Sequence, residues 1–379
     1  MPGVYISYPF CAQKCTYCNF ASGVFARELE PRYVDALIAE ISAHQWAWAP
    51  ETIYLGGGTP SAMAPRDLER ILKPLPHGRG SVASASGPLW REATIEAAPG
   101  TITADLASAW AYSGINRVSL GVQSFIQREL ARTGRKHTAE IVEREVGILR
   151  AAGIANINID LIAGLPGQTR ASWAESLAWI ERLAPPHVSV YMLEIDEDSR
   201  LGSEVLLNGK RYGAPDVPSD ELTAELYEAA VEELARLGIP RYEISNFARP
   251  GCESLHNLKY WNLEPYAGFG ADAHSFDDAS FNGATRAQNI EPAAEYVERI
   301  ACGQSPRIES TAAHLDEERF FVGLRLVHGI QPRPEEWRRF EQPIQRFLAS
   351  GLLEREGSWL RLTNRGVLFS NEVFAEFIT

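Results

Sequence analysis

The sequence of 379 residues has little cysteine, with five residues, and fewer basic than acidic residues, with 36 Lys and Arg against 49 Asp and Glu. The formal net charge of −13 argues against binding to the phosphate backbone of nucleic acids, which requires a basic surface. No apolar run approaches the roughly 18 residues of a membrane-spanning helix. No basic segment followed by an apolar one, as in a signal peptide, precedes the first predicted strand.

The cysteine count excludes a further class of protein. Five is an odd number, and three of the five are crowded near the N-terminus, unlike the disulfide framework of a secreted protein. We therefore expect a cytoplasmic protein with reduced thiols, and leave peripheral association with a membrane open. The 45% of hydrophobic and 22% of charged residues are typical of a globular chain.

Six β-like runs alternate with helical patterns in the first half of the chain. Such a series predicts a parallel sheet with helices outside it. Six units would form a partial (β/α)6 barrel, whose functional groups gather at the C-terminal ends of the strands. The predicted strands are 4–8, 52–55, 93–97, 117–123, 156–162 and 188–193, and the main helical patterns are 34–41, 106–110, 141–152, 173–183 and 222–237.

The remaining segments divide the chain into two predicted domains. We expect a barrel domain at 1–300, with its core at about 4–195, and a small α+β domain of winged-helix type at 301–379. Helical patterns at 315–327 and 335–349, a hairpin at 352–362 and a helix capped by Thr363 predict the second domain. Residues 334–379 contain six Arg and no Lys against seven Glu, which argues against DNA binding and favours a packing role. Residues 74–88 are predicted to form a surface loop, and 279–304 to lead out of the barrel.

Cys11, Cys15 and Cys18 directly follow the first predicted strand with the spacing CxxxCxxC. Three thiolates on one loop can bind three corners of a four-iron cluster, which usually takes four cysteines. One iron would then be open to a substrate or cofactor. The alternative is a zinc site completed by Cys252 or by a histidine, although zinc favours C-x2-C pairs and a closed set of four ligands.

Further candidate residues lie where the next predicted strands end. The glycine-rich turn LGGGTP at 55–60 would let the backbone approach a ligand closely. Glu96, Gln123 and Asp160 each come at or near the end of the third, fourth and fifth strands. Any one of them could be an ordinary residue of a strand end, but their shared position predicts one site.

These motifs resemble the radical S-adenosylmethionine (SAM) superfamily. The resemblance implies a [4Fe–4S] cluster on the three cysteines, whose open iron chelates the amino and carboxylate groups of SAM. Reduction of the cluster then cleaves SAM to a deoxyadenosyl radical. Matched position by position within the motifs, the implied SAM contacts are Tyr5, Gly57, Gly58, Thr59, Glu96, Gln123, Arg135 and Asp160.

The segments from about 5 to 275 and the C-terminal domain are similar to one branch of that superfamily, which comprises oxygen-independent coproporphyrinogen III oxidases and haem chaperones. The oxidase motif continues as CxxxCxxCxC, and Phe20 stands where its further cysteine would be. Phenylalanine has no coordinating atom, so the resemblance favours the chaperones. The sequence HNLKYW at 256–261 also matches an HNxxYW motif of the chaperone group.

That motif supplies the candidate haem ligands. On a helix, His256 and Tyr260 would share a face, and both residue types ligate haem iron. The alternative is that His256 is a hydrogen-bonded core residue that orders a loop. Cys252 and His274 are further haem-ligand candidates, and Cys302 is predicted to be a small buried apolar residue.

The resemblance thus implies a haem chaperone that binds haem and a SAM-liganded [4Fe–4S] cluster and transfers haem to apo-proteins such as respiratory enzymes. An electron donor such as flavodoxin or ferredoxin would be a partner, and a homodimer is left open. The alternative is an oxygen-independent coproporphyrinogen III oxidase, which forms protoporphyrinogen IX by oxidative decarboxylation. A third reading is a radical SAM enzyme with another substrate.

Overall fold

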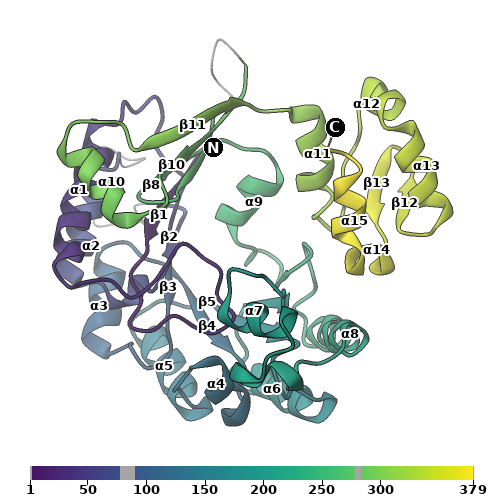
Figure 1. Ribbon diagram of the computed structural model, residues 1–379, viewed down its shortest axis with the longest axis horizontal. Coiled ribbons are helices and arrows are strands. Elements are labelled where there is room, and N and C mark those ends of the chain that lie inside the picture. The colour runs from purple at the N-terminus through teal and green to yellow at the C-terminus, as the bar shows by residue number, and fades with distance from the viewer. Residues whose placement is uncertain (1, 77–89, 278–282, 379) are drawn as a thin grey trace.

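Figure 1 shows the computed structural model, which describes residues 2–76, 90–277 and 283–378. Most of the surface loop predicted at 74–88 lies outside these described residues. Within them, no helix is long and apolar enough to cross a membrane.

An eleven-stranded sheet in the order β11-β10-β9-β8-β1-β2-β3-β4-β5-β6-β7 forms the main layer. Its six central strands pair in parallel, and β1 and β6 lie five places apart in the sheet, so the barrel is open. The predicted partial (β/α)6 barrel is confirmed. These strands are β1 (Gly3–Tyr8), β2 (Thr52–Gly57), β3 (Glu92–Ala97), β4 (Arg117–Gln123), β5 (Asn156–Ala163) and β6 (His187–Met192).

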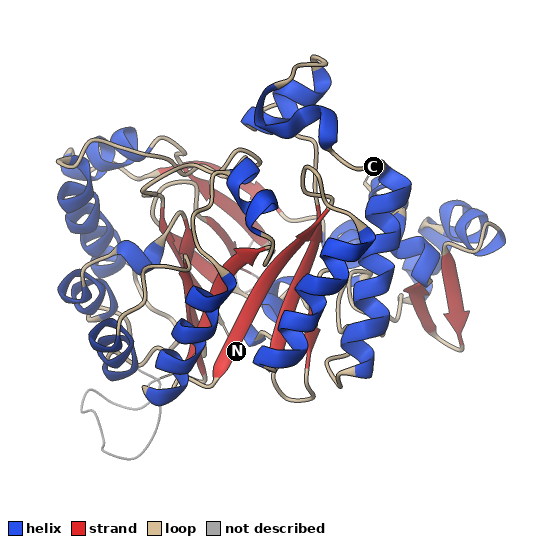
Figure 2. Ribbon diagram, turned by 90° about the horizontal axis from the view of Figure 1, so that it is seen from below, coloured by secondary structure: helices blue, strands red, loops and turns tan. Residues whose placement is uncertain are grey.

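Helices cover the outer face of this sheet (Figures 1 and 2). They are α1 (Leu29–Ala43), α2 (Pro65–Leu72), α3 (Ala104–Tyr112), α4 (Gln127–Thr133), α5 (Ala139–Ala151) and α6 (Arg170–Leu183). Threonine side chains at 103, 138 and 169 cap the amino ends of α3, α5 and α6, because each accepts a hydrogen bond from a backbone N–H of the first turn.

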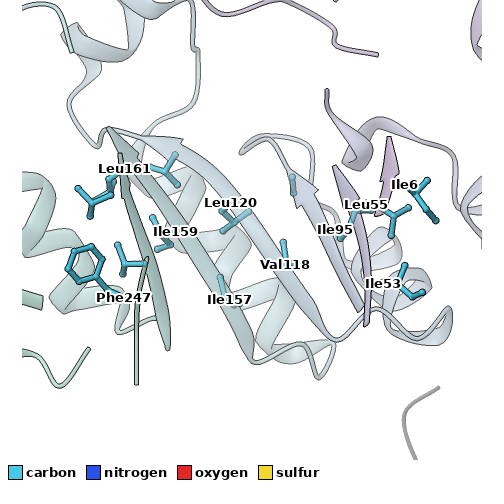
Figure 3. Close-up of a cluster of buried hydrophobic side chains, with 14 of the residues drawn as sticks. Ile6, Ile53, Leu55, Ile95, Val118, Leu120, Ile157, Ile159, Leu161 and Phe247 are labelled. Atoms are coloured by element: carbon cyan, nitrogen blue, oxygen red, sulfur yellow. The ribbon is translucent and has the colours of Figure 1, made fainter. Parts of the chain in front are cut away.

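Successive residues of a strand point to opposite faces of a sheet. The outward-pointing residues are aliphatic and fully buried, among them Val118, Leu120, Ile157 and Ile159 (Figure 3). They pack against the helices in the hydrophobic core. The residues between them, such as Ser119 and Asn158, point to the inside of the barrel, which is therefore polar.

The strands on either side of the barrel were not predicted. β7 (Asn246–Ala248) pairs with β6, and β8 (Tyr266–Phe269) pairs in parallel with β1. β9 (His274–Asp277), β10 (Thr285–Asn289) and β11 (Arg307–Ala312) continue the sheet in antiparallel fashion. The expectation that 279–304 leads out of the barrel is wrong for its described part, which returns to the sheet as β10. The predicted domain boundary at 300 falls before β11, the last strand of the sheet.

The described residues of this later part of the barrel domain form the helices α7 (Arg200–Leu206), α8 (Asp220–Arg236), α9 (Leu255–Trp261) and α10 (Ala293–Ala301). Short 3-10 helices occur at Pro60–Ala62 and Arg211–Asp216. Residues 256–261 are thus helical, as the predicted shared face of His256 and Tyr260 required.

The C-terminal domain contains the predicted hairpin and helices at the predicted positions, but the first helix ends at Gly323 and the pattern at 335–349 forms two helices. It comprises α11 (Leu315–Gly323), α12 (Pro334–Arg339), α13 (Glu341–Ala349), β12 (Leu353–Glu356), β13 (Trp359–Leu362), α14 (Asn364–Leu368) and α15 (Ser370–Ala375). Thr363 caps α14 through the N–H of Gly366, as predicted, but the last helix is divided into two. Arg325 joins this domain to the barrel, because it pairs with the buried Glu243 at 3.3 Å and lies 4.4 Å from the centre of the Trp261 ring.

Candidate functional site

A cavity of about 570 Å³ opens where the parallel strands end. Its wall comprises the loop after β1, the ends of β2 to β6 and the segment after α4. Residues from seven segments of the chain therefore meet in one space, as expected for the C-terminal ends of barrel strands.

Cys11, Cys15 and Cys18 are free, partly exposed thiols that all line this cavity. Thr59 at the end of β2 donates a hydrogen bond to Cys11 Sγ at 3.5 Å. Burial raises the pKa of the Cys18 thiol. The sulfurs border one space and are bound neither to each other nor to another cysteine, which suits a cluster with three cysteine ligands.

Neighbouring segments hold this cysteine loop in place. The N–H of Leu201 in α7 donates to the carbonyl of Thr16 at 2.8 Å, and Gln13 donates to the carbonyl of Gly134 at 3.0 Å. Asn19 donates to the carboxylate of Asp196 at 2.6 Å. The loop is thus fixed to the segments that follow β6 and α4, which also form the cavity rim.

The structure does not support the zinc alternative. In the described ranges, no group of three cysteine, histidine or acidic side chains is placed to hold a single metal ion. Cys252 lies far from the cysteine loop, because its N–H bonds to Arg249 and the N–H of Arg249 bonds to Pro186, before the start of β6. That is the opposite end of the barrel from the cavity.

Two half-buried carboxyl groups, Glu96 on β3 and Asp160 on β5, line the cavity. Burial raises the pKa of Glu96 to about 7 from an ordinary value of 4.5, although Tyr54 Oη donates to its Oε1 at 2.9 Å. Burial also raises the pKa of Asp160, whose two oxygens accept from Ser119 Oγ at 3.0 Å and Asn158 Nδ2 at 2.7 Å. Both carboxyl groups are held in fixed orientations and can accept hydrogen bonds from a ligand.

A basic group also lines the cavity. Arg135 Nη1 donates to the carbonyl of Gly121 at 2.6 Å, and its Nε donates to Tyr17 Oη at 3.2 Å. A side chain at Gly121 would come within 3.1 Å of the Gln123 amide and 3.4 Å of Arg135. Glycine at this position therefore leaves the space in which both side chains reach the cavity.

The structure brings together nearly all the predicted SAM contacts. The described cavity-lining residues include every one of them except Tyr5, whose ring stacks on that of Tyr54 at a centroid distance of 6.1 Å. Sequence reasoning missed Tyr54, Ser119 and Tyr191, which also line the cavity. Neither Tyr54 nor Ser119 was a predicted site residue, but each pairs with one in the sheet. Tyr54 lies beside Tyr5, and Ser119 lies beside Glu96.

His256 lies on α9 with no exposed surface and has both ring nitrogens in hydrogen bonds. Nδ1 is 2.8 Å from Thr52 Oγ1, and Nε2 is 2.8 Å from Tyr260 Oη. Burial lowers its pKa to about 3, so the ring is neutral. This is the geometry of the core-residue alternative, and iron ligation by His256 or Tyr260 requires these bonds to break. Their haem role stays a prediction.

The other candidates lie elsewhere. Cys302 follows α10 and is exposed, so the prediction that it is buried is wrong. His274 is exposed on β9, and Cys252 is partly exposed beyond β7. Phe20, at the position of the missing fourth cysteine, lines the rim of the cavity and is 68% exposed.

Known proteins resemble this chain in both of its domains. The Radical SAM superfamily matches residues 5–180, and the HemN C-terminal domain matches residues 311–369. The chain is 34% identical to heme chaperone HemW of Bacillus subtilis, over 100% of this chain and 99% of the relative. It is 32% identical to heme chaperone HemW of Lactococcus lactis, over 99% of this chain and 96% of the relative.

A solved structure shares the fold. Coproporphyrinogen III oxidase (HemN) from Escherichia coli, described as a radical SAM enzyme, matches with a TM-score of 0.78 and 21% sequence identity. The match covers 100% of this chain and 90% of the oxidase. At this identity, the similarity shows the arrangement of barrel and C-terminal domain and does not distinguish between functions.

The hydrogen bonds of His256 predict that it stabilises the fold. His256→Ala should lower the free energy of unfolding by about 2–4 kcal/mol, because it opens a cavity and leaves Thr52 and Tyr260 without a partner. Urea unfolding measures this change as a lower midpoint with an unchanged slope. His274→Ala, at an exposed position, is the control and should change stability by less than about 0.5 kcal/mol. Unchanged stability with loss of haem binding would instead identify His256 as an iron ligand.

Proposed function

Because the chain belongs to the HemW family of radical SAM proteins, we propose that it is a cytoplasmic haem chaperone. It binds haem and a SAM-liganded [4Fe–4S] cluster, and it transfers haem to apo-proteins such as respiratory enzymes. A flavodoxin or ferredoxin supplies the electron that reduces the cluster. The observation that carries the proposal is the meeting of three free thiols, two half-buried carboxyl groups and one arginine at a single cavity.

The cysteine loop provides the donor set for the cluster. Cys11, Cys15 and Cys18 are the ligands, and a cluster with three cysteines has one iron with an open coordination position. When bound, such a cluster with SAM supplies one-electron and radical chemistry. The residues of the chain around it bind and orient the nucleoside and exclude water.

The residues at the strand ends have separate roles in this proposal. Glu96 and Asp160 accept hydrogen bonds from the ribose hydroxyls, since both are fixed by neighbouring donors. Arg135 pairs with the carboxylate of SAM. Gly57, Gly58 and Thr59 present backbone groups near Cys11 to the amino group, and Gln123 completes the wall. Tyr5 does not line the cavity and contributes by packing against the ring of Tyr54, which does.

Phe20 distinguishes the chaperone from the oxidase. It lies at the rim of the cavity beside Cys18, where its exposed ring offers an apolar surface and no metal ligand. The fold is shared with the oxidase, so this difference in side-chain chemistry is what favours binding and transfer of haem over decarboxylation of a porphyrinogen.

The raised pKa of Glu96 predicts how SAM affinity depends on pH. A carboxylate accepts from ribose hydroxyls better than a carboxylic acid does, and Glu96 ionises at about pH 7. The affinity of the reconstituted protein for SAM should therefore rise by up to about tenfold between pH 6 and pH 8. Isothermal titration calorimetry at several pH values measures this rise, with release of a proton on binding near pH 7. Glu96→Gln should bind more weakly and show no such rise; an equal rise in this variant would contradict the role.

The cluster and the haem cargo can be tested together. Reconstituted oxygen-free protein should contain about four iron and four sulfide per chain and bind haem near stoichiometrically. Cys15→Ala should lose most of the cluster and SAM binding. Cys302→Ala, a variant of an exposed cysteine remote from the cavity, is the matched control and should retain both. Iron and sulfide analysis, SAM titration and haem titration followed by the Soret band are the measurements.

The outcomes separate the possible functions. Absence of haem binding in the intact protein would reject the chaperone proposal. Conversion of coproporphyrinogen III to protoporphyrinogen IX with SAM and a reductant would establish the oxidase instead. Cleavage of SAM with neither haem binding nor porphyrinogen conversion would indicate a radical SAM enzyme with another substrate.

A further inference from the structure

A chain of hydrogen bonds crosses the polar interior of the barrel from the cavity to α9. Asn158 Nδ2 donates to Asp160 Oδ1 at 2.7 Å, and Asn158 Oδ1 lies 2.7 Å from His187 Nδ1. His187 Nε2 lies 3.0 Å from Tyr242 Oη, which accepts from the backbone N–H of Ser254 at 3.2 Å. The chain therefore joins the end of β5 to the residue that begins α9. The function proposed above uses only its first bond, from Asn158 to Asp160.

Chemistry fixes the direction of every bond in this chain. The Asn158 amide must turn its NH2 group to the carboxylate, because two oxygens there would repel each other. Its oxygen can then only accept, so His187 Nδ1 carries the proton. Burial and nearby Arg117 lower the pKa of His187 well below 6.5, so the ring is neutral and Nε2 accepts from Tyr242 Oη. All the donors point the same way, towards Asp160.

Bonds arranged in this way depend on one another. Asn158, His187 and Ser254 are almost completely buried, so water does not compete for these groups. At low dielectric, the members of a hydrogen-bonded chain polarise one another, and a chain that ends on a carboxylate is the strongest arrangement. A ligand hydroxyl that donates to Asp160 takes a share of its charge. It thereby weakens the bond from Asn158 and, through it, each bond that follows.

The far end of the chain holds the N-terminus of α9. Ser254 is the N-cap of this helix, and its Oγ accepts from the N–H of Asn257. The next two N–H groups, of Leu255 and His256, each donate to the Glu92 carboxylate at 2.9 Å. Tyr242 thus satisfies the one N–H of Ser254 while Glu92 satisfies its neighbours. At the other end of α9, Trp261 contacts Arg325.

We propose that Asn158, His187 and Tyr242 are positioning residues that couple a nucleoside hydroxyl bound at Asp160 to the placement of the first turn of α9. The inference rests on the proposed function in one respect, since it takes SAM as the ligand of Asp160. Binding of SAM loosens the N-terminus of α9, the helix that carries the HNxxYW motif. Occupancy of the cavity is thereby signalled to the opposite end of the barrel.

Hydrogen exchange of the reconstituted full chain, with and without SAM, tests the coupling. In the wild-type protein, SAM should speed exchange of the amides at 254–258 by about fivefold or more. Tyr242→Phe removes only the hydroxyl that links His187 to Ser254. This variant should bind SAM within about twofold of the wild type, yet show no acceleration of exchange in α9.

Two further variants separate the coupling from general loosening. Tyr227→Phe removes another buried hydroxyl of the same domain, which bonds to the carbonyl of Ile244 and to Arg241 outside the chain of bonds. It should keep the full response to SAM. His187→Leu interrupts the chain at a second link and should lose the response, as Tyr242→Phe does.

Failure of the coupling and failure of the proposed function give different results in this experiment. If SAM binds but α9 does not exchange faster, or if Tyr242→Phe gives the same acceleration as the wild type, the coupling is rejected and the chaperone proposal stands. If the wild-type protein does not bind SAM, the proposed function fails at its first step. If haem does not bind, this test is unaffected, because it uses SAM alone.

Discussion

The structure depends on one constraint: the inner face of the barrel is polar and largely removed from water, so its polar groups are stabilised by partners inside the protein, although the Thr94 hydroxyl has none. The outer face of the same strands has the opposite character, since its aliphatic residues form the hydrophobic core with the surrounding helices. Apolar packing therefore defines the barrel, and hydrogen bonding organises its interior. Helix α9 completes that interior, because Glu92 and Thr52 on the strands bond to its N-terminus and to His256.

The chemistry of the cavity follows from this constraint. A carboxyl group inside a polar but water-poor barrel is oriented by its neighbours and resists ionisation, as the pKa of about 7 for Glu96 shows. Small residues leave space around such groups for a ligand. A side chain at Gly56, for example, would come within 3.1 Å of the Glu96 carboxylate. The cysteine loop lies at the C-terminal ends of the strands and is held there by hydrogen bonds of its backbone and of the Gln13 and Asn19 side chains. Rigid strands thus fix the polar groups, while a loop supplies the thiols.

The sequence was sufficient for the parts of the molecule governed by local patterns. The bounds of the six parallel strands were predicted within one or two residues, because each strand is a short β-like run between helix and turn signals. β10 and β11 were missed because TRAQN and RIESTA are polar, and β11 is exposed along its whole length. β7, with three residues, is too short to give a periodic signal.

The same distinction applies to the site. Residues within motifs, such as Cys11, Glu96 and Asp160, could be predicted to share a cavity. The roles of Tyr54 and Asn158 could not be predicted, because they depend on the register between strands. Alternation along the strands from Glu96 and Asp160 identifies only the face to which these residues point. The burial of His256 depends on how α9 enters the barrel. Cys302 is exposed because α10 ends there, which composition alone does not reveal.

The central claim is that three thiolates hold a cluster whose remaining iron binds SAM in this cavity. Electron–nuclear double resonance on the reduced, reconstituted protein with SAM labelled at its amino nitrogen or carboxylate oxygen tests this claim most directly. We predict hyperfine coupling between the labelled atom and the cluster, of the size expected for a directly bound ligand. A spectrum of a reduced cluster without coupling to either label, obtained with SAM bound, would contradict the account.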